Sequence, residues 1–135
     1  MSRRLTIALS EPRKVADLLT AVCADIDDAA YAFLASRDGL VIAASGAADE
    51  ASESEVALRG SALASAAIGI GDHFAVLSSH GRLQSTLFES ERGCVGIYPM
   101  SSTVLLVVGT AQAVNLGRLS AAAKKIISAL QEPNG

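Results

Sequence analysis

Few side chains in this sequence could catalyse a reaction or hold a metal ion. His73 and His80 are the only histidines, and neither stands at metal-ligand spacing from another histidine or a cysteine. Ser78-Ser79-His80 places a possible nucleophile beside a possible base, but sequence neighbours rarely align as a Ser–His pair, and the Gly-x-Ser-x-Gly elbow is missing. The aspartates within residues 25–28 lack the glycine and the distal glutamate of a calcium loop. We therefore predict no catalytic residue and no bound metal.

The sequence also lacks the pattern of a nucleotide-binding site. Gly69-Ile70-Gly71 begins a Gly-x-Gly pattern, but it stands inside a helical segment and not after a strand, as a dinucleotide site requires. There is no Gly-x-x-x-x-Gly-Lys phosphate loop. Arg59 or Arg92 could each be a finger directed at a partner's phosphate, although a surface arginine is far more often simply solvated. The prediction is a protein without a cofactor and without enzymatic activity of its own.

Composition excludes several classes of partner. The net charge is −3 and aromatic residues are few, so a nucleic-acid interface, which needs a basic field and stacking surfaces, is not expected. Cys23 and Cys94 are too few for a disulfide framework and are expected to be buried and reduced. The apolar stretch Leu5–Leu9 is too short for a signal peptide, and the longest strongly apolar run, Val104–Val108, is too short to span a membrane. We expect a cytoplasmic protein with no membrane insertion.

Hydrophobic periodicity predicts the elements that would position a functional surface. Apolar residues recur at helical spacing in three segments, and they cluster in five short runs separated by turns. The resulting order is helix, strand, strand, helix, strand, strand, strand, helix, which predicts an α/β chain of the α+β sandwich type. The predicted helices run from Ser10 to about Asp27-Asp28, from about Ser54, and from about Asn115 to before Pro133, and the predicted strands are Tyr31–Ala35, Leu40–Ala44, Leu83–Phe88, Cys94–Tyr98 and Thr103–Val108.

The five strands are expected to form one central, mostly antiparallel sheet with two helices on one face and one on the other. Val104–Val108 is apolar on both faces, so we place this strand in the centre. The first hairpin would join it, which leaves the second and third strands at the edges. Residues 1–135 are predicted to form a single domain with a core of about 10–131, and the arm 1–9 could add a short extra strand at Leu5–Leu9.

Two features predict that two copies of the chain pair. The strand Leu83–Phe88 carries no proline or lysine that would block pairing at its edge. The helix that begins near Ser54 repeats apolar and small residues in a heptad-like pattern, typical of close packing against another helix, although Gly69 and Gly71 could kink it or end it early. The predicted dimer interface consists of Leu83, Ser85 and Leu87 on the edge strand and Val56, Gly60, Leu63, Ala67, Ile70 and Phe74 on the helix.

Several motifs in order resemble the roadblock family. Phe33–Ala43, with its Asp-Gly turn between two apolar strands, is similar to the first hairpin of roadblock domains. Phe88–Gly93 resembles the family's acidic turn between its third and fourth strands, and Leu105–Val108 followed by Asn115-Leu116-Gly117 resembles the last strand and the entry to the last helix. The resemblance covers about residues 10–130, and the order and spacing of the motifs make it fairly specific.

Within the family, Leu5–Leu9 and Gly60–Ala66 are most similar to bacterial MglB-type proteins. The resemblance implies a homodimer with one sheet continuous across two subunits and with paired second helices. It also implies that one dimer engages a small Ras-like GTPase and stimulates GTP hydrolysis by ordering the GTPase's own catalytic groups. The family is not known for inserting an arginine finger, so the resemblance carries over no catalytic residue.

Two other functions stay open at the level of the sequence. The chain could be a scaffold or adaptor dimer in a larger complex, like dynein-associated roadblock chains, with no effect on GTP hydrolysis. It could also be a sensor that holds a small ligand between helix and sheet, which would need a cavity there. For the dimer itself, Ala67→Glu is expected to separate the subunits, because it would bury a like charge from each copy at the joint.

Overall fold

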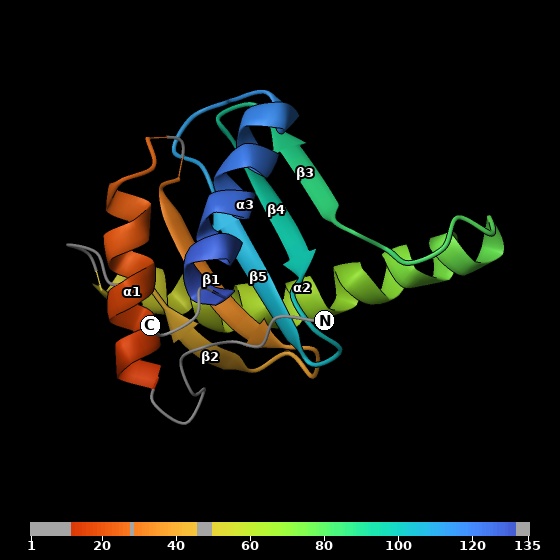
Figure 1. Cartoon of the computed structure of the whole chain (residues 1–135), viewed down its shortest axis with the longest axis horizontal. Helices are drawn as coiled ribbons and strands as arrows, with labels where there is room; N and C mark the ends of the chain where they lie inside the picture. Colours follow the sequence, from red (N-terminus) through yellow and green to blue (C-terminus); the bar gives the residue numbers. More distant parts are fainter. Residues whose placement is uncertain (1–11, 28, 46–49, 132–135) are drawn as a thin grey trace.

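The computed structural model describes residues 12–27, 29–45 and 50–131, which form three helices and five strands (Figure 1). The element order predicted from the sequence is confirmed. In chain order the elements are α1 (Pro12–Ala24), β1 (Tyr31–Ser36), β2 (Val41–Ala44), α2 (Glu50–Leu77), β3 (Thr86–Ser90), β4 (Gly93–Pro99), β5 (Val104–Gly109) and α3 (Leu116–Gln131).

The strands form one antiparallel sheet in the order β2-β1-β5-β4-β3. β5 lies in the centre, as its continuous apolar sequence predicts, and all of its residues are buried. It pairs with β1 from Tyr31 opposite Gly109 to Ser36 opposite Val104. β2 and β3 are the edge strands of this sheet, each paired on one side only among the described residues. The predicted sheet is therefore confirmed in strand order as well as in class.

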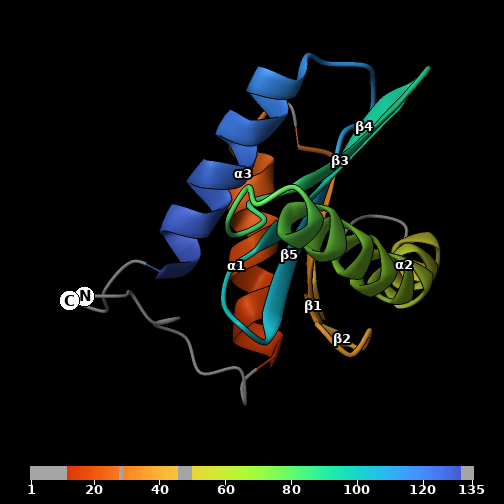
Figure 2. The ribbon, with the colours of Figure 1, turned by 90° about the vertical axis from the view of Figure 1, so that its right-hand side faces the viewer.

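The sheet separates two hydrophobic clusters because alternate residues of each strand point to opposite faces. α1 and α3 cover one face, and α2 crosses the other (Figure 2). Leu34 and Leu106 belong to the larger cluster, on the side of α1 and α3, whereas Phe33 and Leu105 belong to the smaller cluster beneath α2. The expected arrangement of two helices on one face and one on the other is confirmed.

Local signals account for several element ends. The Asn115 Oδ1 atom accepts a hydrogen bond of 2.8 Å from the backbone N–H of Arg118, so this residue caps α3 as a good N-cap side chain does. Gly39 has a φ of 91° in the β1–β2 turn, the positive value that the Asp-Gly pair predicts. Ser10 and Leu5–Leu9, predicted as a cap and an extra strand, lie outside the described residues.

The predicted start of the third strand is wrong, because β3 begins at Thr86 and not at Leu83. Leu83 instead lies in the loop before β3 and packs against α2. A Cβ atom added to Gly71 would lie only 2.7 Å from the Leu83 Cδ2 atom. Leu83 thus anchors the α2–β3 loop to α2 and does not begin a strand. Neither Leu83 nor Ser85 lies on the edge strand β3.

The predicted C-terminal end of the first helix and the predicted start of the second helix are also wrong. α1 ends at Ala24 and not near Asp27-Asp28, because the next two backbone N–H groups bond to carbonyls three residues back and tighten the last turn. α2 begins at Glu50 and not near Ser54, and it continues to Leu77 without a break. The glycines in its second half do not end it.

Candidate functional site

α2 exposes many large apolar side chains, which distinguishes it from α1 and α3. It runs well past the sheet at its C-terminal end (Figure 1). Leu63 is 70% exposed, Ile70 61% and Phe74 64%. Contiguous exposed apolar surface in a soluble protein usually marks a contact site. The exposed large apolar residues of α2 are Val56, Leu58, Leu63, Ile70, Phe74, Val76 and Leu77.

The segment Glu55–Leu77 of α2 is long and apolar enough, by length and composition alone, to cross a membrane. The expectation that no run of the sequence approaches that length is therefore wrong. Such a helix is weak evidence for a membrane span, since core helices of soluble proteins share these properties. One face of this segment packs on the sheet, and it carries Arg59 and Asp72, whose charges would cost about 3 kcal/mol each at the centre of a bilayer.

The heptad-like pattern of α2 divides into two faces. Val56, Leu63 and Ile70 form an exposed stripe at intervals of seven residues, and we call it the α2 stripe. Gly60 and Ala67, predicted to share this interface, turn toward the sheet instead. A Cβ atom on Gly60 would lie 2.8 Å from the Cζ atom of Phe33, and Ala67 is 8% exposed within the smaller cluster. Their small side chains allow α2 to approach its own sheet, so they are not part of the exposed stripe, although both line the apolar groove between α2 and the sheet.

An apolar groove lies between the α2 stripe and the part of the sheet that α2 leaves uncovered. Its volume is about 730 Å³. Tyr31 and Phe33 of β1 contribute to its floor, and their rings stack with centroids 6.2 Å apart. The remaining sheet residues of the groove are Phe88 of β3, Val95 and Ile97 of β4, and Val107 of β5, and those of α2 include Val56, Leu63 and Ile70.

The groove residues of the sheet were missed at the level of the sequence. Val95 and Ile97 alternate along β4 and point to the same face, as does Val107 on β5. This alternation shows that one face of each strand is apolar, but it does not show which helix covers the face. Only the position of α2, which packs mainly on β1 and β2 and meets β3 near Thr86, reveals that the described helices cover this face of β3 and β4 incompletely.

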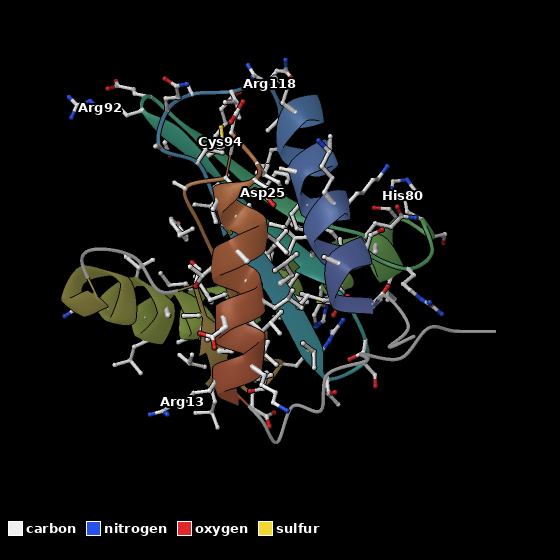
Figure 3. All side chains as sticks on the ribbon, turned by 60° about the vertical axis from the view of Figure 1, so that its left-hand side comes forward. Arg13, Asp25, His80, Arg92, Cys94 and Arg118 are labelled. Atoms are coloured by element: carbon white, nitrogen blue, oxygen red, sulfur yellow. The ribbon has the colours of Figure 1, made fainter. Side chains whose placement is uncertain are left out.

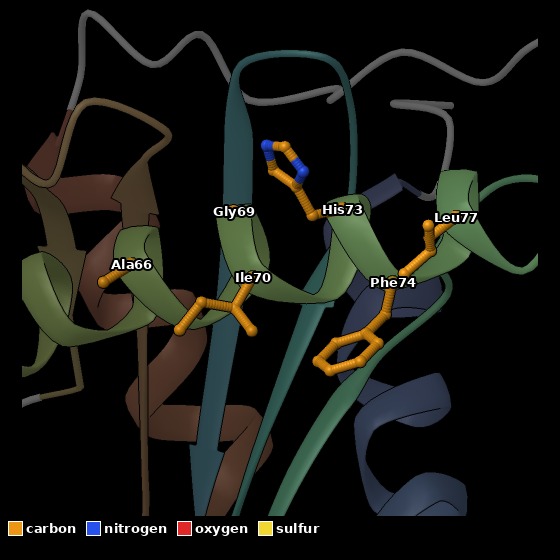
Figure 4. Close-up of a pocket in the computed structure, with 6 residues that line it drawn as sticks. All are labelled: Ala66, Gly69, Ile70, His73, Phe74 and Leu77. Atoms are coloured by element: carbon orange, nitrogen blue, oxygen red, sulfur yellow. The ribbon is translucent and has the colours of Figure 1, made fainter.

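A second apolar hollow continues along the exposed C-terminal part of α2. Its volume is about 500 Å³, and it is lined by Ala66, Gly69, Ile70, His73, Phe74 and Leu77. Ile70 and Phe74 point to the same side of the helix, whereas His73 points away from them (Figure 4). The α2 stripe is therefore extended by Phe74, and His73 lies on a helix surface rather than at a metal site.

The outer edge of β3 offers backbone groups for pairing. Within the part of the chain that the structure describes, β3 pairs with β4 only, and its sequence contains no proline or lysine. Phe88 is 50% exposed beside the groove, and Leu87 points to the opposite face, where it packs against the larger cluster. Of the three strand residues predicted for the interface, only Leu87 lies on β3.

The sequence motif Ser78-Ser79-His80 follows α2 and closes its C-terminal end. Ser79 adopts a positive φ of 55°, and its N–H bonds to the carbonyl of Val76. The His80 N–H bonds to the carbonyl of Ala75. These two bonds and the left-handed residue are the Schellman arrangement that closes many helices.

The charged side chains of the described residues are scattered over the surface or paired locally. Among the described residues, no group of three or more His, Cys, Asp or Glu side chains could hold a metal ion. Arg59 pairs with Glu55 one turn earlier on α2, at 3.2 Å. His80 and Arg92 lie far apart (Figure 3). Burial raises the pKa of Tyr31 above its usual value of 10, so this groove residue stays neutral at physiological pH.

Comparisons with known proteins agree with this architecture. Residues 15–110 match the Roadblock/LC7 domain family, and the chain belongs to this family. No curated protein sequence matches the chain. MglB of Myxococcus xanthus superimposes with a TM-score of 0.71 at 19% identity, over 90% of this chain and 88% of that one.

Two further solved structures have the same fold. The gliding protein MglB of Thermus thermophilus has a TM-score of 0.70 at 19% identity, over 97% of this chain and 96% of its own. A Roadblock/LC7 domain from Streptomyces avermitilis has a TM-score of 0.70 at 18% identity, over 84% and 91%. At these identities the likeness concerns the fold.

Proposed function

We propose that the chain acts as a homodimer in the cytoplasm, in which α2 of each copy lies in the groove of the other. The observation that carries this proposal is the position of the α2 stripe directly beside the apolar groove between α2 and the sheet. A second α2 would cover Leu63 and Ile70 and would also cover Phe88 and the partly exposed Val95 beside them. One helix would thus bury two apolar surfaces that a single chain leaves exposed.

The same arrangement brings the two β3 edges together. Pairing of β3 with β3 of the second copy would extend the sheet across both chains and would satisfy the backbone groups at its open edge. Phe88, half exposed beside the groove, would be covered near this joint. We infer that Val56, Leu63, Ile70 and Phe74 of α2 and residues 86–90 of β3 form the interface.

We further propose that the dimer binds a small Ras-like GTPase and stimulates its GTP hydrolysis. Membership of the Roadblock/LC7 family and the shared fold with MglB support a regulatory role, as does the resemblance of the sequence to MglB-type proteins. In this proposal the dimer supplies no catalytic side chain. It acts by holding the GTPase's own catalytic groups in order, because positioning and electrostatics dominate phosphoryl transfer.

The outer side of α2 is the surface that we propose for the GTPase. Leu58 is 68% exposed and Val76 79%, and neither lines the groove. They are 18 positions apart, which places them on the same side of a helix with 3.6 residues per turn. A second copy seated in the groove would leave this side open. Ala62 and Gly69, both exposed between them, would allow the partner to approach closely.

Leu63→Glu and Leu58→Glu form a matched pair that tests both parts of the proposal. Both leucines are about 70% exposed on the same helix, and they point about 140° apart. Leu63→Glu would bury an unpaired carboxylate from each copy, so we expect sedimentation equilibrium to show a monomer, with dimer affinity reduced at least about 100-fold. Leu58→Glu should stay dimeric but should no longer accelerate GTP hydrolysis by the small GTPases of the same genome.

The outcomes separate the two proposals. A Leu63→Glu variant with unchanged mass would show that the α2 stripe is not the interface. If the unmodified chain binds a GTPase but leaves its hydrolysis rate unchanged, the chain is an adaptor and not an activator. If it binds none of them, the proposed partner is wrong, whatever the oligomeric state.

A further inference from the structure

A polar cleft lies at the end of the sheet where three turns meet. It is lined by Arg37 from the β1–β2 turn, by Arg82–Gln84 from the α2–β3 loop and by Pro99–Ser102 from the β4–β5 turn. Its volume is about 760 Å³. Arg82, Leu83 and Gln84 also line a neighbouring hollow beside the end of α2, and none of the cleft residues lines the groove.

The cleft is positively charged in a chain whose net charge is −3. Two arginines line it and no carboxylate does. The Arg37 Nη1 atom donates to the Asp72 Oδ2 atom of α2 at 3.0 Å, and both side chains are partly exposed. Arg82 is exposed and makes no ion pair with any described residue. One arginine charge is thus partly balanced, whereas the other is not.

Arg37 has hydrogen-bonding capacity that the described residues do not use. A guanidinium carries five N–H donors in a planar fork. The Arg37 Nε atom is buried and has no hydrogen-bond partner among the described residues. Because this atom is buried, a ligand in the cleft would contact the accessible part of the guanidinium group, whose side chain is 34% exposed. The ion pair with Asp72 holds this side chain at the wall of the cleft.

The other walls indicate the shape of a ligand. Ser101 and Ser102 are exposed and line the cleft, and the Ser101 Oγ atom accepts the backbone N–H groups of Thr103 at 3.2 Å and Val104 at 3.1 Å, which fixes the turn. Pro99 and Met100, together with Leu83 on the loop, provide an apolar wall. The donors suit an oxyanion, and the apolar wall suits an organic group attached to it.

We propose that this cleft binds a phosphate monoester of a small organic molecule. Two guanidinium groups from separate turns can bond several oxygens of one group, and a phosphate offers three terminal oxygens and up to two charges, against two oxygens and one charge for a carboxylate. No residue of the cleft is among those proposed for the dimer interface or for the outer side of α2, so the proposal does not depend on the proposed function.

Nuclear magnetic resonance of the intact chain tests the site directly. Phenyl phosphate, benzoate and inorganic phosphate are titrated separately into the labelled protein. We expect phenyl phosphate to shift the Arg37 Nε–H signal and the backbone amides of residues 100–102 in a saturable manner, with a Kd of about 1 mM or lower. Benzoate, which has the same ring but a carboxylate, should bind at least about tenfold more weakly, and so should inorganic phosphate, which lacks the organic group.

Two variants and a matched control complete the test. Arg82→Gln removes an exposed charge that forms no ion pair with a described residue, and it should weaken phenyl phosphate binding about tenfold. Arg37→Lys keeps the charge but removes the planar fork, and it should weaken binding by a similar factor. Arg92→Gln removes an arginine from the β3–β4 turn, at the other end of β4 (Figure 3), and should have no effect.

Three results would overturn the proposal. The first is the absence of a saturable shift at Arg37 or in the β4–β5 turn. The second is an equal loss of affinity in Arg92→Gln and Arg82→Gln, which would mean that the anion responds only to net charge. The third is binding of benzoate as tight as that of phenyl phosphate, which would show that the cleft does not recognise a phosphoryl group.

Discussion

Alanine substitutions at Gly60 and Gly69 test how closely α2 lies on its own sheet. Both glycines are inside α2, where alanine is favoured over glycine by about 1 kcal/mol. A Cβ atom on Gly69 would meet nothing within 4 Å, so Gly69→Ala should raise the free energy of unfolding by about 1 kcal/mol. A Cβ atom on Gly60 would lie 2.8 Å from Cζ of Phe33, whose side chain is 2% exposed and held in the core.

The overlap at Gly60 sets the expected magnitude. Either Phe33 or α2 must shift, and overpacking of this kind costs about 1–3 kcal/mol. The gain in helix propensity of about 1 kcal/mol offsets part of that cost. We therefore expect Gly60→Ala to lower the free energy of unfolding by about 0–2 kcal/mol and to lie about 1–3 kcal/mol below Gly69→Ala.

Urea unfolding followed by circular dichroism measures both variants, at one fixed protein concentration because association adds to the apparent stability. Combining Gly60→Ala with Phe33→Leu removes the overlapping ring atoms, so the alanine should cost less in that background than with Phe33 present. Equal stabilisation by Gly60→Ala and Gly69→Ala would refute the reasoning, since it would mean that α2 does not rest on the Phe33 ring.

Four other substitutions have defined outcomes. Ala67→Glu should unfold the chain instead of separating two folded subunits, because the carboxylate would enter the cluster beneath α2 without a partner; we expect a loss of about 3 kcal/mol or more by circular dichroism. Asn115→Ala removes the cap of α3 and should cost about 1 kcal/mol in urea unfolding. Asp72→Asn breaks a partly exposed ion pair and should cost less than about 1 kcal/mol in the same assay. The pKa of Tyr31 is raised by burial, so the folded state holds its proton more tightly than the unfolded state; stability should fall as the pH rises above 10, and Tyr31→Phe should reduce that slope.

The features that the sequence predicted are those set by local residue patterns. Val104–Val108 is apolar at every position, and this alone places β5 in the middle of the sheet. The Asp38-Gly39 pair predicts the first hairpin because glycine accepts its positive φ, and Asn115 predicts the start of α3 because its side chain can cap the helix.

The features that the sequence did not predict depend on which surface a residue meets. A seven-residue repeat identifies the apolar side of α2, but it does not distinguish Leu63, which is exposed, from Ala67, which faces the chain's own sheet. Leu83 has the composition of a strand residue and instead fills the space beside Gly71. Arg37 and Arg82 are 45 positions apart and share a cleft only because the sheet brings three turns together.

The exposed side of α2 also has a consequence for the life of a newly made chain. Leu63, Ile70, Phe74 and Leu77 are each more than 60% exposed in the single folded molecule. Chaperones and proteases recognise such surfaces, and a chain released from the ribosome at low abundance has few copies of itself to meet. The amount of dimer in the cell should therefore rise more than in proportion to the rate of synthesis. Expression level would then itself control how much functional protein accumulates.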